Sequence, residues 1–525
     1  MLSKGLSSLA PVLVCLSFGH NALTALAAEQ RVERTSAKSS HSVIHGILYN
    51  EDDSHRFRLD PEGTMKPKRL DRIVDALADS QVTVMLICCN GKKAVYDSKA
   101  WEIYSEGFDP AKDDSQAFFG NQPLGQRADT RQFVRNLQIM LEAGVCPMQR
   151  MIDRCRNRGI SPWVSVRMND AHEATVLKSP EHSRFWMEHP EFHLPNHGTN
   201  VGLNYGIKPV RDHYMALLRE VCDRFDMDGL ELDWNRFCPY FVDGEEVNQS
   251  KVLTKWMGEV RQVVRAAEKK WKHRIYLAAR VPARPEVSMG LGLDAVTWTK
   301  LGLIDHLIVA PFWVTTDFDV PVERWSELLK DTGVGVTVGL EQNVRAYWNE
   351  FIPNTPELRR GAAMAALGRG SQGIYLFNYF NFADQKNPAL LNDSYLFKEM
   401  GSIESLLSKD RSYTITYVDI DLAGKPIPGL LPKKLLPNES ADFSMFIGPK
   451  PLPSVRGKIY LRLSAERSGE SCEARVTLNG QPPISDFTFG SAAFREGYNT
   501  VRVVNTGKSA MTAHTVKLSL QFPSP

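Results

Sequence analysis

The spacing of apolar residues changes once along the chain, near Ser412. Before that residue, short and almost wholly apolar runs alternate with segments in which apolar residues recur at helical spacing. After it, apolar and polar residues alternate with a period of two, between turns. The pattern predicts a strand-and-helix domain followed by an all-strand domain.

Eight apolar runs rich in β-forming residues are predicted to be the strands of the first domain. They cover residues 42–50, 82–90, 161–170, 228–235, 274–281, 304–313, 333–341 and 371–380. Most lack a polar face, as parallel strands covered by helices do. Eight strand–helix units predict the α/β class and a (β/α)8 TIM barrel over residues 42–400. An open, doubly wound sheet is the rival, but no G-x-G-x-x-G motif or P-loop follows the first strand.

A linker over residues 401–411 leads to the second domain, a predicted antiparallel β-sandwich over 412–525. Its period-two segments are "YTITYVDIDL", "KIYLRLSAER", "EARVTLNG", "NTVRVVNTG" and "HTVKLSLQF", and "PIPGLLPKKLLPNES" is expected to form loops. The pattern "VTLNGQPP…FREGYNTVRVVNTG" resembles galactose-binding-like jelly-roll modules that are attached to carbohydrate enzymes. The resemblance implies an accessory domain, and a purely structural role stays open beside glycan binding.

The first residues have the order of an export signal. Lys4 precedes an apolar stretch, and small residues follow at Ala25, Ala27 and Ala28. We expect residues 1–28 to be a signal peptide, residues 29–41 to be a flexible leader, and the protein to be periplasmic or extracellular. No later run approaches the roughly 18 apolar residues that span a bilayer, so no membrane segment is expected in the mature protein.

Composition narrows the class of partner. Hydrophobic residues make up 43% of the chain and charged residues 24%, as in an ordinary globular protein. A formal net charge of +2 gives no electrostatic reason to expect a nucleic-acid partner. A neutral, polar ligand such as a carbohydrate fits better, and no cofactor motif is present.

The carboxyl ends of the predicted strands are polar, charged or aromatic, unlike the strand interiors. In TIM barrels these ends form the active site. Strand ends turn polar wherever a chain leaves the core, but that does not account for acids and tryptophans occurring together. Trp234 and Trp313 are expected to stack on sugar faces. The full set of expected substrate contacts is Arg167, Asn169, Asp170, His172, Trp234, Asn235, Arg236, Arg280, Trp313, Asn378 and Tyr379.

The stretch "DGLELDWN" places two acids on one face of a strand. Glu231 and Asp233 are two residues apart, about 6.5 Å along the strand. Glycosidic cleavage needs two carboxyls that flank the bond. Asp233 is expected to supply one, as nucleophile or acid/base, and Glu341, at the end of the seventh strand, the other. Glu231 lies one layer deeper, so we expect it to orient or tune the site while paired with Arg167 or Arg280.

The motif "FDGLELDWNRF" resembles the fourth-strand motif "DG-I/L-x-x-D-x-x-R-[FY]" of family-10-like, glycoside-hydrolase-like secreted barrels. The resemblance covers residues 42–400 and implies a carbohydrate-active barrel. The strand is also similar to the nucleophile strand of α-galactosidase-type barrels, although Glu231 stands where those barrels have lysine. That second resemblance implies an acid/base on the sixth strand's loop, so Asp317 or Asp319 rivals Glu341 as partner of Asp233.

Five histidines occur within "HEATVLKSPEHSRFWMEHPEFHLPNH", which raises the alternative of a metal site. No H-x-x-x-H pair lies on a predicted helix there, and the proline-rich stretch favours a loop over the barrel. No G-x-S-x-G elbow is present, which argues against an α/β-hydrolase. The sequence therefore predicts an exported glycoside hydrolase without a metal. The alternative is a barrel that binds glycan without cleaving it.

Overall fold

The computed structural model describes residues 44–195, 201–312, 315–379, 394–417, 429–466 and 470–523. The predicted signal peptide (1–28), the predicted leader (29–41) and Trp313 lie outside these residues. His197, one of the five clustered histidines, lies outside them as well.

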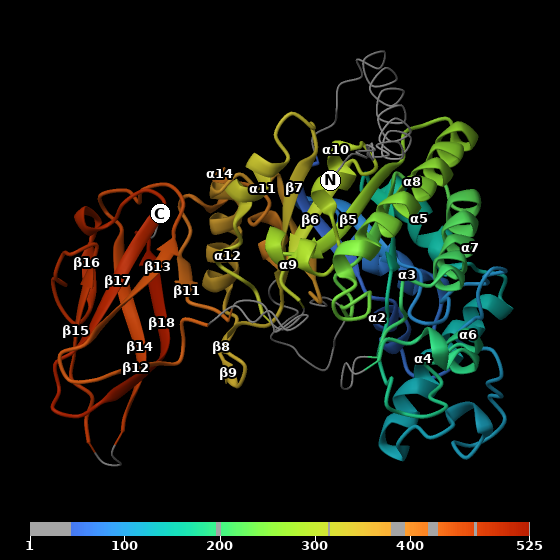
Figure 1. The fold of residues 1–525 in the computed structure, drawn as a ribbon, viewed down its shortest axis with the longest axis horizontal. Coiled ribbons are helices and arrows are strands. Elements are labelled where there is room, and N and C mark those ends of the chain that lie inside the picture. The colour runs from blue at the N-terminus through green and yellow to red at the C-terminus, as the bar shows by residue number, and fades with distance from the viewer. Residues whose placement is uncertain are drawn as a thin grey trace, which may run out of the picture.

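Eight parallel strands close into a barrel, as predicted (Figure 1). They are β1 (Gly46–Glu51), β2 (Val82–Cys88), β3 (Ser161–Arg167), β4 (Gly229–Asp233), β5 (Tyr276–Pro282), β6 (His306–Ala310), β7 (Gly335–Glu341) and β10 (Gly373–Phe377). Around the barrel their order is β1-β10-β7-β6-β5-β4-β3-β2, so each strand pairs with its neighbours in the strand–helix series. The closed sheet excludes the open, doubly wound alternative.

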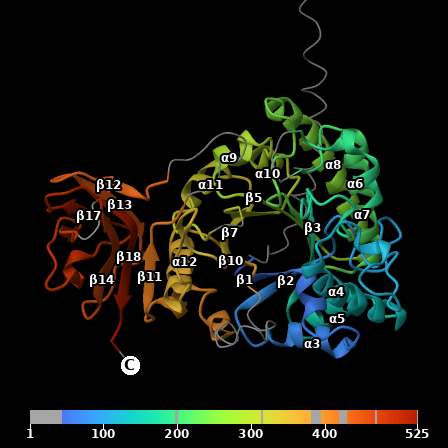
Figure 2. The same cartoon turned by 90° about the horizontal axis from the view of Figure 1, so that it is seen from below.

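Helices surround the barrel on its outside (Figure 2). They are α3 (Pro67–Asp75), α4 (Leu124–Glu142), α5 (Pro147–Asn157), α7 (Lys208–Arg224), α8 (Glu246–Trp271), α10 (Ala295–Lys300), α11 (Val322–Leu328) and α12 (Pro356–Gly368). Proline stands in the first turn of α3, α5, α7 and α12, where its missing N–H needs no partner. Among the described residues, none of the helices combines the length and the apolar character that a bilayer crossing requires.

Side chains fill the barrel interior, which is therefore a packed core and not a pore. The apolar ones are Leu48, Val84, Leu86, Trp163, Ala278, Ile308, Tyr375 and Phe377. Gly229 leaves room for the Trp163 ring, because a Cβ at that glycine would lie 2.2 Å from it. The large indole is thereby accommodated at one end of the barrel, and the polar residues gather toward the other.

The long segment over residues 91–127 packs onto the outer helices. It contains the 3-10 helix η1 (Ala117–Phe119), and α4 already begins at Leu124. The Trp101 ring stacks on His213 of α7, with centroids 4.3 Å apart. Tyr96 Oη donates to Glu220 Oε2 at 2.8 Å. The segment therefore covers α7 with buried aromatic rings.

The second domain is an antiparallel sandwich, as predicted, with two sheets ordered β11-β18-β14-β16 and β13-β17-β15 and with β12 on the edge of β18. The strands are β11 (Arg411–Thr414), β12 (Lys433–Leu435), β13 (Ser440–Phe446), β14 (Arg456–Ala465), β15 (Ala474–Leu478), β16 (Thr488–Gly490), β17 (Tyr498–Asn505) and β18 (Met511–Gln521). β12 corrects the expectation that its segment is only a loop. The predicted linker contains the short helix α14 (Ile403–Leu406).

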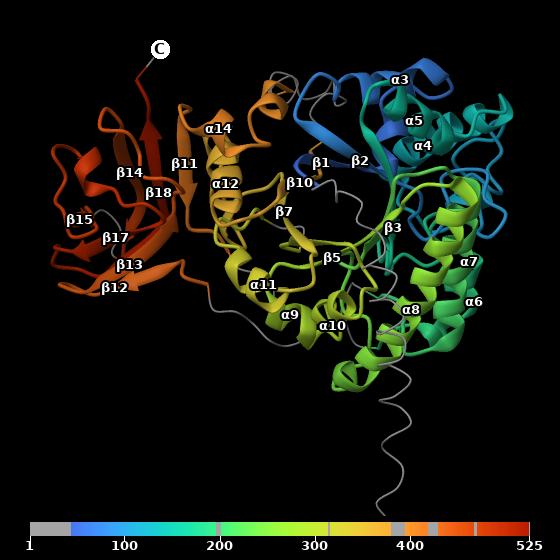
Figure 3. The same ribbon diagram turned by 90° about the horizontal axis from the view of Figure 1, so that it is seen from above.

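The sandwich packs directly against the barrel through α12 and β11 (Figure 3). The contact is close because α12 carries Gly361, where a Cβ would lie 1.8 Å from the carbonyl oxygen of Ser412. Farther along the contact, Tyr498 Oη donates to Asp319 Oδ1 at 2.7 Å. The Arg369 guanidinium, which forms an ion pair with Asp319 within the barrel, lies 5.4 Å from the centroid of the Tyr498 ring. Backbone packing and side-chain polar contacts therefore join the two domains.

Candidate functional site

The carboxyl ends of the barrel strands, called the mouth below, lie on the lower side of the barrel in Figure 1. Two short helices stand at this end, α2 (Asp53–Arg58) after β1 and α6 (Arg184–Glu188) after β3. A hairpin of β8 (Arg345–Tyr347) and β9 (Glu350–Phe351) follows β7. Charged side chains on these strands or directly after them form two groups, one at β4, β5 and β7 and the other at β1 and β3.

Asp233 is the centre of the first group. The register of β4 and β5 sets it beside Arg280, and Arg280 Nη1 donates to both carboxylate oxygens at 2.8 and 2.9 Å. The backbone N–H of Asn235 donates to Oδ1 at 3.0 Å. Both side chains of the ion pair are buried. The carboxyl group of Asp233 therefore accepts three hydrogen bonds in a buried setting.

Glu341 enters the same group from the end of β7. The N–H of Gln342 donates to its Oε1 at 2.8 Å, and Asn378 Nδ2 donates to Oε2 at 3.2 Å. Asn378 adopts a left-handed backbone conformation (φ 60°), which asparagine tolerates better than most residues. Burial raises the pKa of Glu341 to about 7, against the opposing effect of the Gln342 N–H and of Arg280. Glu341 is therefore partly protonated near neutral pH.

Arg280 links these two acids electrostatically. Its guanidinium lies 4.1 Å from the centroid of the Phe377 ring, which holds the planar group in place. The guanidinium of Arg236 lies over the same ring at 5.3 Å. Both arginines lower the pKa of Glu341, while Arg280 is bonded to Asp233. The carboxyls of β4 and β7 thus share one buried positive environment.

Glu231 lies one layer below Asp233 on β4 and is fully buried. Ser165 and Tyr375 lie beside its carboxyl group. Burial raises the pKa of Glu231 to about 8, the Asp233 carboxylate adds to the increase, and Arg280 opposes it. Of Arg167 and Arg280, the two arginines proposed as its partner, Arg280 is therefore the one whose charge lowers the pKa of Glu231. A protonated Glu231 at neutral pH follows from this environment.

Arg167, the other candidate, belongs to the second group, at the ends of β1 and β3. It forms ion pairs with Asp52, Asp53 and Asp170. Burial raises the pKa of Asp53 to about 6; Arg167 opposes this, and Asp52 adds to the increase. Carboxylate oxygens of these three acids can accept hydrogen bonds, so this side of the mouth suits donors on a ligand.

The sequence pattern did not indicate Asp52 and Asp53, which join Arg167 in the second group. The predicted first strand ended at Asn50, whereas β1 continues to Glu51 and the two aspartates follow at once. The run "EDD" after an apolar strand was the available indication. Glu51 itself points away from the barrel interior and forms a buried ion pair with Arg56.

Three predicted ligand-binding residues connect loops at the mouth. The side chain of Asn169 pairs with the backbone of Leu203, and Asn235 Nδ2 donates to the carbonyl oxygens of Ala310 and Pro311 at 3.0 and 2.9 Å. Both asparagines are buried. The third residue, Asp170, accepts from the backbone N–H of His172 at 3.0 Å and contacts its Nδ1 at 2.8 Å. The nearby charges of His172, Lys92 and Arg167 hold the pKa of Asp170 well below its usual range.

Trp234 does not face the mouth, contrary to the expected sugar-stacking role. Side chains alternate along a strand, so the residue after Asp233 points outward. Its indole is fully buried among the rings of Tyr205, Tyr240, Trp256 and Trp298. Tyr379 is buried as well, and its hydroxyl donates to the carbonyl oxygen of Glu341 at 3.3 Å. The exposed polar group among the predicted contacts is His172, whose side chain is 47% exposed.

The two rival acids on the loop after β6 have partners of their own. Arg284 Nη1 donates to Asp317 Oδ2 at 2.5 Å, and Asp317 Oδ1 accepts from the N–H of Asp319 at 2.8 Å. Asp319 faces the sandwich through Tyr498. Glu341, in contrast, shares Arg280 with Asp233, so it is the better-placed partner.

The clustered histidines lie among aromatic rings. Trp186 packs between His182 and His193, with ring centroids 4.0 and 4.2 Å away. Burial lowers the pKa of His182 to about 3. In the described part of the chain, no three His, Cys, Asp or Glu side chains are grouped as metal ligands.

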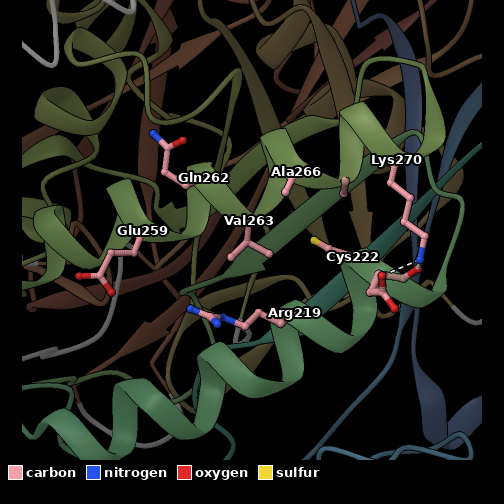
Figure 4. Close-up of a pocket in the computed structure, with 9 residues that line it drawn as sticks. Arg219, Cys222, Glu259, Gln262, Val263, Ala266 and Lys270 are labelled. Carbon is pink, nitrogen blue, oxygen red and sulfur yellow. Dashed lines mark hydrogen bonds and ion pairs between the residues drawn. The ribbon is translucent and has the colours of Figure 1, made fainter.

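A groove on the outer wall of the barrel lies between α7 and α8 (Figure 4). Arg219, Glu259 and Gln262 line it, and Lys270 forms an ion pair with Asp223 at one end. The groove is formed by helix surfaces, away from the strand ends that carry the two charged groups. It therefore has no part in the candidate site.

Comparisons with known proteins give partial matches. No family model matches the chain. Over 247 residues, 38% of this chain, the sequence is 21% identical to Glycosyl hydrolase DigH of Escherichia coli O6:H1. Identity to the protein of that name from Shigella flexneri is 20%. The chain spans about half, 54%, of the length of these relatives.

Two solved structures match most of the chain at low identity. The PgaB (BpsB) glycoside hydrolase domain from Bordetella bronchiseptica is 10% identical, with a TM-score of 0.40, covering 69% of this chain and 99% of that one. A variant of trehalose-6-phosphate hydrolase (TreA) from Bacillus licheniformis is 11% identical, with a TM-score of 0.39, covering 88% of this chain and 99% of that one.

Proposed function

We propose that this protein hydrolyses glycosidic bonds, with Asp233 and Glu341 as the two acting carboxyls. The observation that carries the proposal is that two buried acids, from β4 and β7, act on one buried guanidinium, that of Arg280. Such pairs of carboxyls are what glycosidic cleavage requires. The similarity to Glycosyl hydrolase DigH supports the same reaction class.

The surroundings of the two acids favour different roles. Asp233, which accepts three hydrogen bonds, suits the carboxylate that attacks the sugar or activates water. Glu341, with a pKa of about 7, suits the general acid that protonates the leaving oxygen. In glycosidases the acid and the base typically occupy different environments, one that binds the carboxylate with hydrogen bonds and one that favours the proton. Glu231 lies below the two acids. Because it is protonated at neutral pH, it adds no second negative charge next to Asp233.

The proposed substrate is a carbohydrate chain bound across the mouth. Arg236 and the exposed His172 stand beside Phe237, with the Arg236 guanidinium 5.5 Å and the His172 ring 4.7 Å from its centroid. Both side chains offer hydrogen bonds to hydroxyl groups. The aspartates around Arg167 would accept from hydroxyls on the β1 side.

The decisive experiment measures release of new reducing ends from a polysaccharide panel of soluble starch, carboxymethyl cellulose, arabinoxylan and glycol chitin. The chains compared are the wild type, Asp233→Asn, Glu341→Gln and the matched control Asp317→Asn. We expect release by the wild type and the Asp317 variant, and a loss of about 100-fold or more in the other two, on the order of what general acid catalysis contributes.

Other outcomes assign the chemistry differently. Full activity of Asp233→Asn keeps the hydrolase and removes this site from it. Loss in Asp317→Asn with activity in Glu341→Gln makes the β6 loop the source of the second acid. Absence of release from every polysaccharide counts against hydrolysis and favours glycan binding without cleavage.

Export is proposed on residues 1–28, which have the order of a signal peptide. The test is fractionation of cells that express the full chain and the chain without these residues. A periplasmic or extracellular full chain, with the shortened chain retained in the cytoplasm, is the expected result. Cytoplasmic location of both would refute export.

A further inference from the structure

The β8–β9 hairpin exposes two aromatic rings beside the mouth. Trp348 is 52% exposed and Phe351 is 59% exposed. The guanidinium of Arg345 lies over both rings, 5.2 Å from the centroid of Trp348 and 4.1 Å from that of Phe351. Arg345 Nη1 also donates to the carbonyl oxygen of Trp348 at 3.1 Å. These three side chains, called the platform below, form an ordered aromatic surface that faces solvent.

The hairpin is held in place by the rest of the molecule. Two strands of this length are marginal by themselves, so tertiary contacts must fix them. Val344 and Ala346 are buried beneath the hairpin. The N–H of Arg345 donates to Thr315 Oγ1 at 2.9 Å, and the N–H of Tyr417 donates to the carbonyl oxygen of Arg345 at 2.9 Å.

The sandwich holds the far end of the hairpin. Tyr347 Oη and His514 Nδ1 of β18 are joined by a hydrogen bond of 2.8 Å. Arg462 of β14 forms an ion pair with Glu350. Figure 1 shows the hairpin at the lower edge of the barrel, on the side of the sandwich. The hairpin that carries the two rings of the platform is therefore held in place by contacts with both the barrel and the sandwich.

The platform is continuous with the candidate active site. Only three residues separate Glu341 from Arg345. Thr316 Oγ1 donates to the carbonyl oxygen of Glu341 at 2.5 Å and accepts from its N–H at 2.9 Å, while the neighbouring Thr315 binds Arg345. Burial lowers the pKa of Arg345, and the Glu341 carboxylate opposes the decrease, so the two charges are close enough to interact.

We propose that Trp348, Phe351 and Arg345 form an outer sugar subsite for the glycan chain whose cleavage is proposed at the mouth, so that the substrate is a polysaccharide. This inference rests on the proposed function. Exposed aromatic rings offer flat apolar faces that stack on sugar rings, and the guanidinium supplies donors for hydroxyls at the ring edge. A chain held at Glu341 and on the platform at once needs more sugar rings than a chain held at Glu341 alone.

The test compares the wild type, a Trp348→Ala/Phe351→Ala double variant and the control Tyr460→Ala. Tyr460 is a matched control because it is an exposed ring (40%) with a cation, Lys517, 4.7 Å from its centroid, on the sandwich strand β14. Retardation in gels containing each polysaccharide of the panel measures affinity, and released reducing ends measure cleavage. Competition by the disaccharide of the retained polymer measures binding of a short ligand.

We expect the double variant to lose about tenfold in affinity for the retained polysaccharide, as two lost stacking contacts imply, and to lose less for the disaccharide. Tyr460→Ala should match the wild type. Equal retardation of the double variant and the wild type overturns the platform and leaves the hydrolase standing. Retardation that depends on the platform without any cleavage upholds the subsite and overturns the proposed hydrolysis. Absence of both retardation and cleavage in the wild type overturns both.

Discussion

Glu231→Gln is the substitution that best tests whether the barrel interior keeps a buried carboxyl group protonated. Burial and Asp233 raise the pKa of Glu231 from 4.5 to about 8, so the folded protein holds this proton more tightly than the unfolded chain does. The stabilisation is complete below pH 4.5 and is lost as the pH rises toward 8. With 1.36 kcal/mol for each tenfold change, the loss between pH 5 and pH 8 is roughly 3 to 4 kcal/mol.

Glutamine has the shape of the protonated acid but cannot ionise. The variant should therefore match the wild type within about 1 kcal/mol at pH 5 and be the more stable protein at pH 8. Urea unfolding at both pH values, followed by far-UV circular dichroism, measures the difference. Glu496→Gln, at an exposed position, serves as the control, and its two differences should be small.

The opposite pattern would refute the reasoning. If Glu231→Gln is destabilised by the same amount at pH 5 and pH 8, the native carboxyl is ionised throughout and forms an ion pair with Arg280. A glutamate in that state would also leave Asp233 with only a share of its guanidinium.

Three further changes test the fold and the site. Arg280→Met leaves Asp233 buried without its ion-pair partner, so we expect a loss of about 3–5 kcal/mol in the free energy of unfolding; an unchanged urea midpoint would contradict the pairing. Gly361→Ala places a methyl group 1.8 Å from the Ser412 carbonyl oxygen and should destabilise the protein by about 1–3 kcal/mol in a thermal unfolding assay. The control Gly258→Ala, whose added methyl group would meet nothing within 4 Å, should be neutral or slightly stabilising in the same assay. Glu341→Gln should remove the alkaline fall in cleavage rate near pH 7, and a wild-type rate that stays flat from pH 5 to 9 would exclude Glu341 as general acid.

The barrel could be predicted because the sequence patterns that mark its strands and helices each span only a few neighbouring residues. Eight apolar runs separated by helical spacing mark the strands, and the β/α alternation leaves few topologies. The same periodicity predicted that Glu231 and Asp233 point to one side, which the register beside Ser165 and Arg280 agrees with. Short edge strands such as β12 escaped prediction, because three residues carry too little periodicity to separate a strand from a loop.

The pairing of charges could not be predicted in this way. Arg167 ends β3 and Arg280 lies two residues before the end of β5, and only the closed barrel brings one to the aspartates after β1 and the other to Asp233. The predicted sugar-stacking role of Trp234 was wrong because side chains alternate along a strand. Asp233 faces the barrel interior, so Trp234, the next residue, points outward. Of the rings that bury it, those of Tyr205, Trp256 and Trp298 come from segments more than twenty residues away.

The amino-acid sequence specifies which residues can ionise and which runs form strands, and its period-two pattern sets two acids on one face of β4. Tertiary structure alone decided which of those groups meet and in what protonation state. The reason is physical: hydrophobic periodicity acts between residues a few positions apart, whereas a pKa depends on burial and on charges brought together from distant segments. Burial in the closed barrel raises the pKa of Glu341 to about 7, against the lowering effect of Arg280, and no local pattern around residue 341 encodes either influence.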